Sequence, residues 1–307
     1  MTQYPKKVLH TTKDQINELI GSGLIIKNIP KAEEFLTTVN YYRFRGFSFP
    51  FYDNATKKYT KGTDIETIIE IYHFNAELAS LFLSFTSKIE ISIRAYFVEA
   101  MLTTNDPLSY LDPSYFETKE NFWNNVAAIA KDIGRASEIF IKHQFDGHDG
   151  LVPIWAAVEV ISFGTLSKVL DSLGASKNPN SKILFNIVAK HYSYNTKKAK
   201  GIIPSPDFIK SWLQCVVLIR NVCAHNARLY NRVINKKPKI LKEDTKNTVS
   251  SYYGVYEALL AMKYLRPNNE EWTHLVSDLK NLLNKHSKAI DIKKLNFPPD
   301  WETHFRL

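Results

Sequence analysis

The sequence predicts an all-α protein, because its apolar residues recur at helical spacing and glycine is scarce. Of 307 residues, 44% are hydrophobic and only 11 are glycine. This composition disfavours an all-β fold and a glycine-rich nucleotide-binding fold. The clearest helical signal runs from residue 64 to about 102, where apolar side chains recur at steps of three and four: Leu78, Phe82, Phe85, Ile89, Ile93, Tyr96 and Ala100.

The N-terminal region is expected to hold two short helices and then an aromatic and basic run. A helix over residues 12–21 begins with Thr and ends with Gly, and a second helix over about 31–39 follows Pro30. Residues 40–51 read Asn-Tyr-Tyr-Arg-Phe-Arg-Gly-Phe-Ser-Phe-Pro-Phe, and a polar turn region follows. We take residues 1–63 as an N-terminal helical segment.

The helical pattern continues to the C-terminus. Further helices are expected over residues 119–142, 155–170, from 206 onwards, about 250–265 and 269–286. A region rich in Lys, Asn and Tyr lies at 177–200, and a lysine-rich loop lies at 235–247. We therefore expect a helical core over residues 64–240 and a C-terminal helical segment over 241–307.

Charge and hydropathy narrow the class of protein. The net charge of +9 raises the expectation of a polyanionic partner such as RNA. No stretch approaches the roughly 20 apolar residues that a bilayer span requires, and the N-terminus lacks the apolar core of a signal peptide. We expect a cytoplasmic protein that does not associate with membranes.

The two cysteines, Cys215 and Cys223, are expected to be small buried apolar residues. On one helix they would lie about 12 Å apart along the axis, which is beyond the reach of a disulfide.

The stretch from Leu218 to Arg232 gives the strongest functional signal. It places cationic, amide and imidazole groups at the end of an apolar helical run: Arg220, Asn221, His225, Asn226, Arg228 and Arg232. Histidine is the side chain best able to move protons near neutral pH, and arginine offers a fixed fork of donors that suits phosphate oxygens. The combination indicates a site that handles a phosphate.

RNA cleavage is the reaction that these groups fit best. Attack by the 2′-hydroxyl needs a base, an acid for the leaving 5′-oxygen, and cations for the charge on the phosphorane. His225 can serve as either proton carrier, and Arg220 can bind the phosphate, with Asn221 and Arg228 positioning the substrate. This route needs no metal or cofactor, and no His/Asp/Glu set has convincing ligand spacing.

Helix geometry constrains this site. Residues five apart are separated by about 140° around a regular helix, so Arg220 and His225 would not share a face. Asn221, His225 and Arg228 do share one. The site therefore needs a bulge or helix end, or a second copy of the motif. We expect a homodimer that brings two histidines together.

Glu159 is expected to support this site. It falls on the same helical face as Trp155 and Leu166, and a buried carboxylate needs a cationic partner such as the arginines of the motif. The alternative is purely structural: Arg220 caps a helix end or pairs with Glu159, and His225 is a core histidine.

The aromatic and basic run offers a second RNA-binding surface. Arginines bind phosphates and aromatic rings stack on bases, which makes Tyr42, Arg43 and Arg45 candidates, along with Asn226 and Arg232 of the motif. The alternative is that the aromatics fill the core while Arg43 and Arg45 pair with acidic neighbours. Glu90 and Arg94, one turn apart on the long helix, are expected to form a structural ion pair.

Four blocks of sequence occur in a defined order over most of the chain. They are Val-Asn-Tyr-Tyr-Arg-Phe-Arg-Gly at 39–46, Lys-Ile-Glu-Ile-Ser-Ile-Arg at 88–94, Pro-Ile-Trp through Ser-Phe-Gly-Thr-Leu-Ser at 153–167, and the motif at 220–232. Asn-Phe-Pro-Pro-Asp-Trp at 296–301 closes the series. This series resembles the Abi family of bacterial abortive-infection proteins, the AbiD/AbiF-like group of the HEPN superfamily.

The resemblance implies a HEPN-like helical bundle with N- and C-terminal helical extensions, and a dimer. It implies a metal-independent ribonuclease of phage defence, with Arg220 and His225 catalytic and with toxicity held back by a small RNA or a partner. One departure is visible: relatives commonly place Asp and Arg where this chain has Asn75 and Ala76. A non-catalytic RNA-binding or sensing module is the alternative function, and a metal-dependent enzyme is a distant third.

Overall fold

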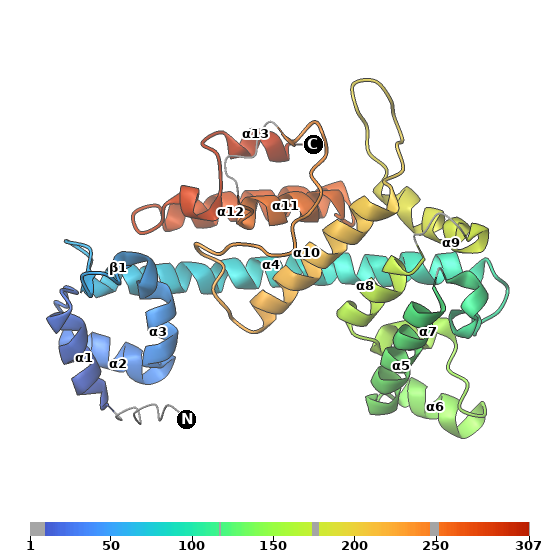
Figure 1. The fold of residues 1–307 in the computed structure, drawn as a ribbon, viewed down its shortest axis with the longest axis horizontal. Helices are drawn as coiled ribbons and strands as arrows, with labels where there is room; N and C mark the ends of the chain where they lie inside the picture. The colour runs from blue at the N-terminus through green and yellow to red at the C-terminus, as the bar shows by residue number, and fades with distance from the viewer. Residues whose placement is uncertain (1–9, 117, 174–177, 246–251, 307) are drawn as a thin grey trace.

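A single long helix, α4 (Ile65–Leu102), organises the molecule in the computed structural model (Figure 1). The structure describes residues 10–116, 118–173, 178–245 and 252–306. Asp64 begins α4 by accepting a hydrogen bond from the Thr67 amide at 2.7 Å. At 1.5 Å per residue the helix is about 57 Å long. Its apolar side chains are buried on several sides, because other helices pack along its whole length.

The N-terminal unit packs against the first half of α4. It comprises α1 (Thr12–Gly21), α2 (Ile29–Val39), α3 (Tyr41–Ser48) and a hairpin of β1 (Tyr52–Asp53) and β2 (Lys58–Tyr59). The rings of Phe35 and Phe47 pack edge-to-face on Tyr72 of α4, with centroids 5.3 and 5.2 Å away. The aromatic and basic run is thus largely helical, and its phenylalanines help to anchor the unit.

A second lobe surrounds the other half of α4. It is formed by α5 (Lys119–Arg135), α6 (Ile139–Gly147), α7 (Ile154–Val160) and α8 (Phe163–Asp171), with α9 (Pro179–Ala189) beside it. Arg94 of α4 donates to the carbonyl oxygens of Val158 and Ile161, at 2.9 Å for Ile161, and so caps the end of α7.

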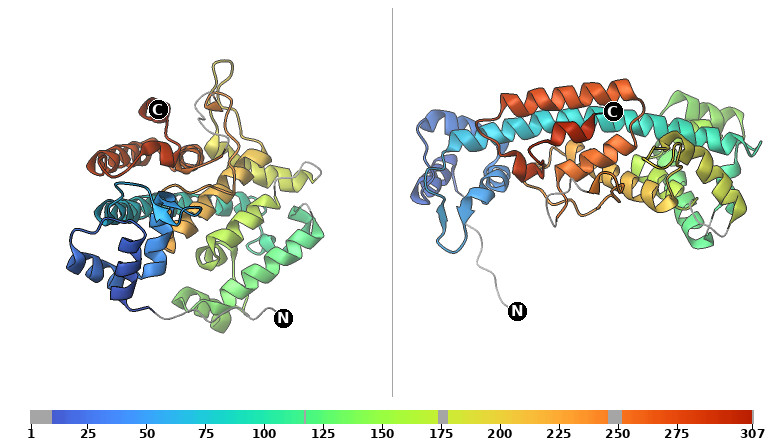
Figure 2. Two further views of the ribbon diagram at one scale, coloured as in Figure 1. Left: turned by 60° about the vertical axis from the view of Figure 1, so that its left-hand side comes forward. Right: turned by 90° about the horizontal axis from the view of Figure 1, so that it is seen from above.

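The helix that carries the motif, α10 (Pro206–Ala224), crosses α4 obliquely. On the upper side of α4 in Figure 1 lie α11 (Val255–Tyr264), α12 (Asn269–Lys285) and α13 (Trp301–Phe305). Figure 2 shows α12 running alongside α4. His286, at the end of α12, places its two ring nitrogens 2.8 Å from Glu70 and 3.2 Å from Glu77 of α4, which ties the two helices together.

The prediction of an all-α fold is confirmed, and most helices lie where the sequence places them. Three differences stand out. The expected helix 119–142 is two helices, α5 and α6, because Ala136 has an extended backbone. The expected helix 155–170 breaks at Ile161, where Ser162 caps α8. The 177–200 region contains α9, which Asn178 caps ahead of Pro179.

Two further expectations can be compared with the structure only over the described residues. They are the helix over about 250–265 and the lack of a membrane-spanning segment. The expected start of the 250–265 helix falls on residues 246–251, which lie outside the described residues, and α11 begins at Val255. The described helices include none with the length and apolarity to cross a membrane.

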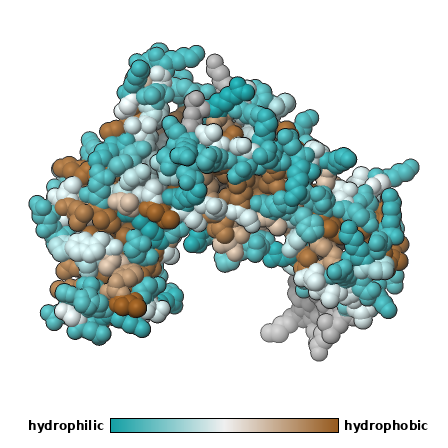
Figure 3. Space-filling view, turned by 180° about the vertical axis from the view of Figure 1, so that it is seen from behind, coloured by the Kyte–Doolittle hydropathy of each residue, from teal (hydrophilic) through white to brown (hydrophobic). Residues whose placement is uncertain are grey.

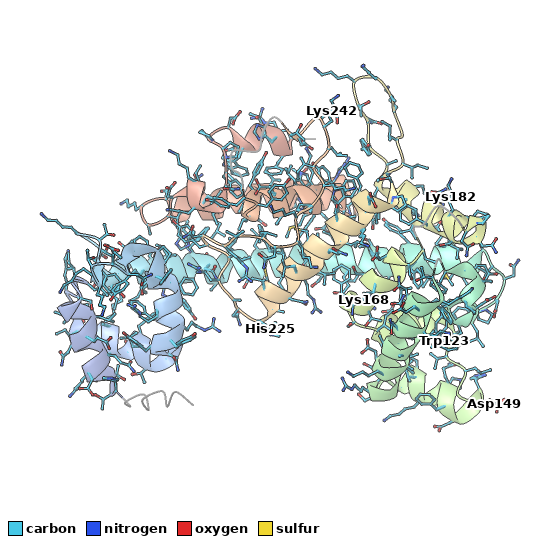
Figure 4. All side chains as sticks on the ribbon, viewed as in Figure 1. Trp123, Asp149, Lys168, Lys182, His225 and Lys242 are labelled. Carbon is cyan, nitrogen blue, oxygen red and sulfur yellow. The ribbon has the colours of Figure 1, made fainter. Side chains whose placement is uncertain are left out.

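The two lobes give the molecule an arched shape. The N-terminal unit and the α5–α8 lobe both project from the same side of α4 (Figure 1), and the space-filling view in Figure 3 is hollowed between them. The C-terminal end of α10 enters the arch, where Figure 4 places His225. The fold therefore presents the motif inside a concave face.

Candidate functional site

The candidate site begins where α10 ends. Asn226 adopts a left-handed backbone, with φ of 49°. Its amide donates to the Cys223 carbonyl at 2.9 Å, and the Ala227 amide donates to the Val222 carbonyl at 2.9 Å. This pair of bonds is a Schellman motif, in which asparagine is one of the few residues that tolerate the required backbone. His225 is consequently the helix C-cap, and the motif lies at a helix end.

Arg220 is held by a buried carboxylate on another helix. Its Nε lies 3.6 Å from Oε2 of Glu90, whose side chain is only 11% exposed. The second oxygen of Glu90 pairs with Arg94, which confirms the expected Glu90–Arg94 ion pair. The Arg220 side chain is 36% exposed, and its Nη1 donates to Asn221 Oδ1 at 3.3 Å. Arg220 is thus ion-paired at its inner end, where its Nε forms no hydrogen bond to a described residue, and its outer end is open.

His225 is exposed at the tip of the helix. Its amide donates to the Asn221 carbonyl at 3.1 Å. Among the described residues, none forms a hydrogen bond or ion pair with its imidazole, and none links it to Arg220. The alternative of a core histidine is therefore wrong. The imidazole is available to a ligand or to a second chain.

The segment after the helix carries two arginines that lack an acidic partner in the described part of the chain. Arg228 is half-buried, and burial together with the nearby charge of Arg232 lowers its pKa. Its Nη1 is buried without a hydrogen-bond partner there. Arg232 donates to the Arg228 carbonyl at 3.3 Å. Two adjacent cations that are not neutralised favour the binding of an anion.

Asn75 of α4 anchors this segment, and sequence reasoning did not assign it that role. Its Oδ1 accepts from the amides of Leu229 at 2.6 Å and Tyr230 at 3.1 Å, and its Nδ2 donates to the Ala227 carbonyl at 3.4 Å. The residue is 3% exposed. The signal that could have found it is a polar residue within a largely apolar stretch of the long helix.

The structure brings one residue of the aromatic and basic run to the motif. Arg43 of α3 donates from Nη1 to the Asn226 carbonyl at 2.5 Å. Tyr42 is 86% exposed, as a base-stacking residue would be. Arg45 instead donates to the Tyr59 hydroxyl at 2.7 Å and stacks on Tyr52, with 4.5 Å to the ring centroid. Arg45 therefore has a structural contact inside the N-terminal unit.

Glu159 does not occupy the buried position expected of it. Its neighbours Ala156, Ala157 and Val158 point into the core, so Glu159 and Trp155 lie on the exposed side of α7. The carboxylate that pairs with Arg220 is that of Glu90. The prediction that Glu159 is buried against the motif arginines is wrong, because α7 buries the face with Ala157 and Val158 and leaves Glu159 exposed.

The described residues include no cluster of metal-ligating side chains, and the two thiols of α10 are buried. Within the described ranges, no three His, Cys, Asp or Glu side chains lie close enough to hold a metal ion. Both cysteines of α10 are free and buried, as expected, and burial raises the pKa of the Cys223 thiol to about 12.

Comparison with family models decides the family. The model described as Abi-like protein matches residues 34–231, which is 198 of the 307 residues. The chain belongs to the Abi-like family. This membership supports a role in abortive infection, a form of phage defence. A comparison with curated proteins and another with solved structures each gave no match.

The Abi-like match covers the candidate site and stops at its edge. It includes Asn75, Glu90, Arg220 and His225, and it ends beside Arg232. The helices α11, α12 and α13 lie beyond it. The residues that contact one another around the end of α10 are therefore nearly all within the part of the chain that defines this Abi-like protein.

Two of the sequence blocks have structural explanations, one inside the matched range and one beyond it. In 162–167, the Ser162 hydroxyl caps α8, and Asp132 of α5 accepts from the Ser162 amide at 3.0 Å and the Thr165 hydroxyl at 2.9 Å. In 296–301, the side-chain Nδ2 of Asn296 donates to the Tyr252 carbonyl at 2.7 Å and to the buried Glu257 carboxylate at 3.1 Å. These blocks hold helices in place at a distance from His225.

Proposed function

We propose that this Abi-like protein is a metal-independent endoribonuclease that acts at the C-terminal end of α10. The observation that carries the proposal is the pairing of two features there. A guanidinium is fixed by the buried Glu90 carboxylate, and an imidazole five residues later is exposed with no described residue bound to its ring. The first suits phosphate binding, and the second suits proton transfer.

In the proposed reaction the RNA 2′-oxygen attacks the adjacent phosphorus and forms a P–O bond, while the bond from phosphorus to the 5′-oxygen breaks. The products are a 2′,3′-cyclic phosphate and a 5′-hydroxyl. His225 takes the proton of the 2′-hydroxyl or delivers one to the leaving 5′-oxygen. Arg220 stabilises the charge that develops on the equatorial phosphate oxygens.

The reaction needs two proton carriers, and one chain offers one imidazole at the end of α10. The angular separation of about 140° between Arg220 and His225 also keeps them on different sides of the helix. We infer that two chains assemble with their α10 ends adjacent, so that one imidazole acts as base and the other as acid. With it we propose placement in the AbiD/AbiF-like group of the HEPN superfamily, the resemblance to which implies a dimer.

The arch around His225 supports RNA as the substrate. Arg43, Arg228 and Arg232 supply charge for phosphates, and Tyr42 supplies an exposed ring for a base. Since such an activity in the cytoplasm would be toxic, we propose that a small RNA or a protein partner restrains it until infection.

The test is cleavage of RNA by the purified full-length protein in EDTA. We expect His225→Ala and Arg220→Gln to abolish cleavage, and the product ends to be a cyclic phosphate and a hydroxyl. His274→Ala is the matched control, because His274 is exposed on α12 far from the site along the chain. Equal cleavage by wild type and His225→Ala would show that His225 is not the proton-transfer residue.

One observation favours a second candidate, a non-catalytic RNA-binding module. Catalytic imidazoles are usually oriented by a hydrogen bond to the second ring nitrogen, and no described residue supplies one to His225. This candidate predicts salt-dependent RNA binding with intact RNA. Arg228→Gln would then weaken binding and lower the salt slope by about one. The exposed Lys288→Gln serves as the control.

A further inference from the structure

A polar cavity of about 390 Å³ lies at the opposite end of α10 from His225. Its volume falls in the range of small-molecule sites. Residues from the loop after α9, from α10, from the α11–α12 turn and from the C-terminal end line it, among them Tyr194, Asn195, Trp212, Arg266, Asn268 and Arg306. Together with the segment at Leu241–Asp244, five separate parts of the chain therefore converge on one partly open cavity.

One cation of the cavity already has partners. Lys263 lies 3.6 Å from Asp244 and donates to the His304 carbonyl at 2.7 Å. Asp244 also accepts from the Tyr264 hydroxyl at 2.7 Å. These contacts form a structural network at the cavity wall, so neither Lys263 nor Asp244 is free to neutralise another group.

Arg266 is different, because it is oriented without being neutralised. Its Nε donates to Asn269 Oδ1 at 2.9 Å and its Nη1 donates to the Lys263 carbonyl at 2.7 Å. It forms no ion pair within the described ranges, and burial lowers its pKa. Arg306 is exposed and likewise forms no ion pair there. The remaining acid of the lining, Glu243, is exposed.

We propose that this cavity binds a small phosphate-bearing anion through Arg266 and Arg306. A guanidinium that is already held in place loses little freedom on binding, and its fork matches phosphate oxygens. The aromatic wall at Tyr194 and the amides of Asn195 and Asn268 suit the base or sugar of a nucleotide. A phosphate group is thus common to the ligands that suit this cavity, and a nucleotide would contact more of the lining residues than phosphate alone.

This site is separate from the candidate nuclease site. Trp212 and His225 lie 13 residues apart, which is about 20 Å along the helix. Figure 4 places Lys242, which adjoins the lining residue Glu243, on the other side of α4 from His225. The proposal does not depend on RNA cleavage. Because α10 joins both places, a ligand in the cavity is positioned to act on the same helix.

Isothermal titration calorimetry of the full-length protein tests the proposal, with inorganic phosphate, pyrophosphate, AMP and ATP as probes. We expect saturable binding whose Kd rises at least tenfold in Arg266→Gln and in Arg306→Gln. Arg135→Gln, an exposed arginine on α5, should bind like wild type. Equal affinity for pyrophosphate and ATP would identify the phosphate alone as the ligand, and a preference for AMP or ATP would identify a nucleotide.

Arg306→Gln keeps the test decisive even if Arg266→Gln fails to fold, since Arg306 is exposed near the end of the chain. Intrinsic tryptophan fluorescence supplies a second readout, because Trp212 of the lining is one of the five tryptophans that contribute to it. The absence of saturable binding with all four probes, or binding that neither substitution weakens, would overturn the proposal.

Discussion

The guanidinium Nε of Arg220 lies 3.6 Å from the buried carboxylate of Glu90, on a different helix. The same carboxylate pairs with Arg94, which in turn caps α7. A single acid therefore serves two arginines, one structural and one at the candidate site. Its removal would affect both the fold and the position of Arg220.

Glu90→Gln should destabilise the protein by about 3 kcal/mol, because it leaves two partly buried guanidinium groups without their counter-ion. Urea unfolding followed by circular dichroism measures this. RNA cleavage should also fall, since Arg220 loses the group that orients it. Glu159→Gln is the matched control: its carboxylate is exposed, and we expect a change within about 0.5 kcal/mol. A larger loss in Glu159→Gln than in Glu90→Gln would reverse our assignment.

Asn75→Ala should destabilise the protein by about 2 kcal/mol or more, because the buried amides of Leu229 and Tyr230 lose their acceptor. Cleavage should fall with it, as the segment beyond His225 is no longer tied to α4. Asn75→Asp retains an acceptor oxygen, and we expect it to lose less stability than Asn75→Ala. Chemical denaturation of the three proteins compares them. Equal losses would mean that the Nδ2 bond to Ala227, and not the accepted bonds, matters.

The two thiols should be inert in the folded protein. Cys215 and Cys223 are buried, and burial raises the pKa of both, to about 12 for Cys223. Thiolate is the reactive form, so Ellman's reagent should label neither thiol near pH 8 and both in concentrated urea. Rapid labelling of the native protein would show that the C-terminal part of α10 opens readily.

Stability should decline in acid partly through Glu77. Its hydrogen bond to Lys285, together with the contact to His286, lowers the pKa of this carboxyl. A carboxyl whose pKa is lowered by folding stabilises the protein above its unfolded pKa, and that contribution is lost as pH falls through the folded pKa. Urea midpoints from about pH 6 to about pH 3 should therefore drop less steeply in Glu77→Gln than in wild type. Glu159→Gln should follow wild type.

The sequence predicted the helices well where apolar periodicity was long, as in α4 and α12. It could not locate the break at Ile161, because apolar residues lie on both sides of Ser162, which caps the next helix. The split at Ala136 has no proline or glycine signal at that residue. The two helices pack separately: α5 contacts both α7 and α8, and α6 contacts α7.

For the site, local sequence predicted which residues gather at one helix end, and tertiary contacts decided their partners. Asn226 is a recognisable helix terminator, so the end of α10 could be inferred from the motif itself. The choice of Glu90 over Glu159 could not be inferred, because both are single acids on apolar helical faces. Only the crossing of α10 over α4 places one beside Arg220 and leaves the other exposed.

Because α4 anchors the site at two residues, the number of residues between them is constrained. Asn75 holds the segment after α10 and Glu90 holds Arg220, and both belong to the same uninterrupted helix. Since each residue turns an α-helix by about 100°, inserting or deleting one residue between them would rotate one anchor away from its partner. The fifteen-residue interval from 75 to 90 is therefore fixed by helical phase, so substitutions in it should be tolerated more readily than any change in its length.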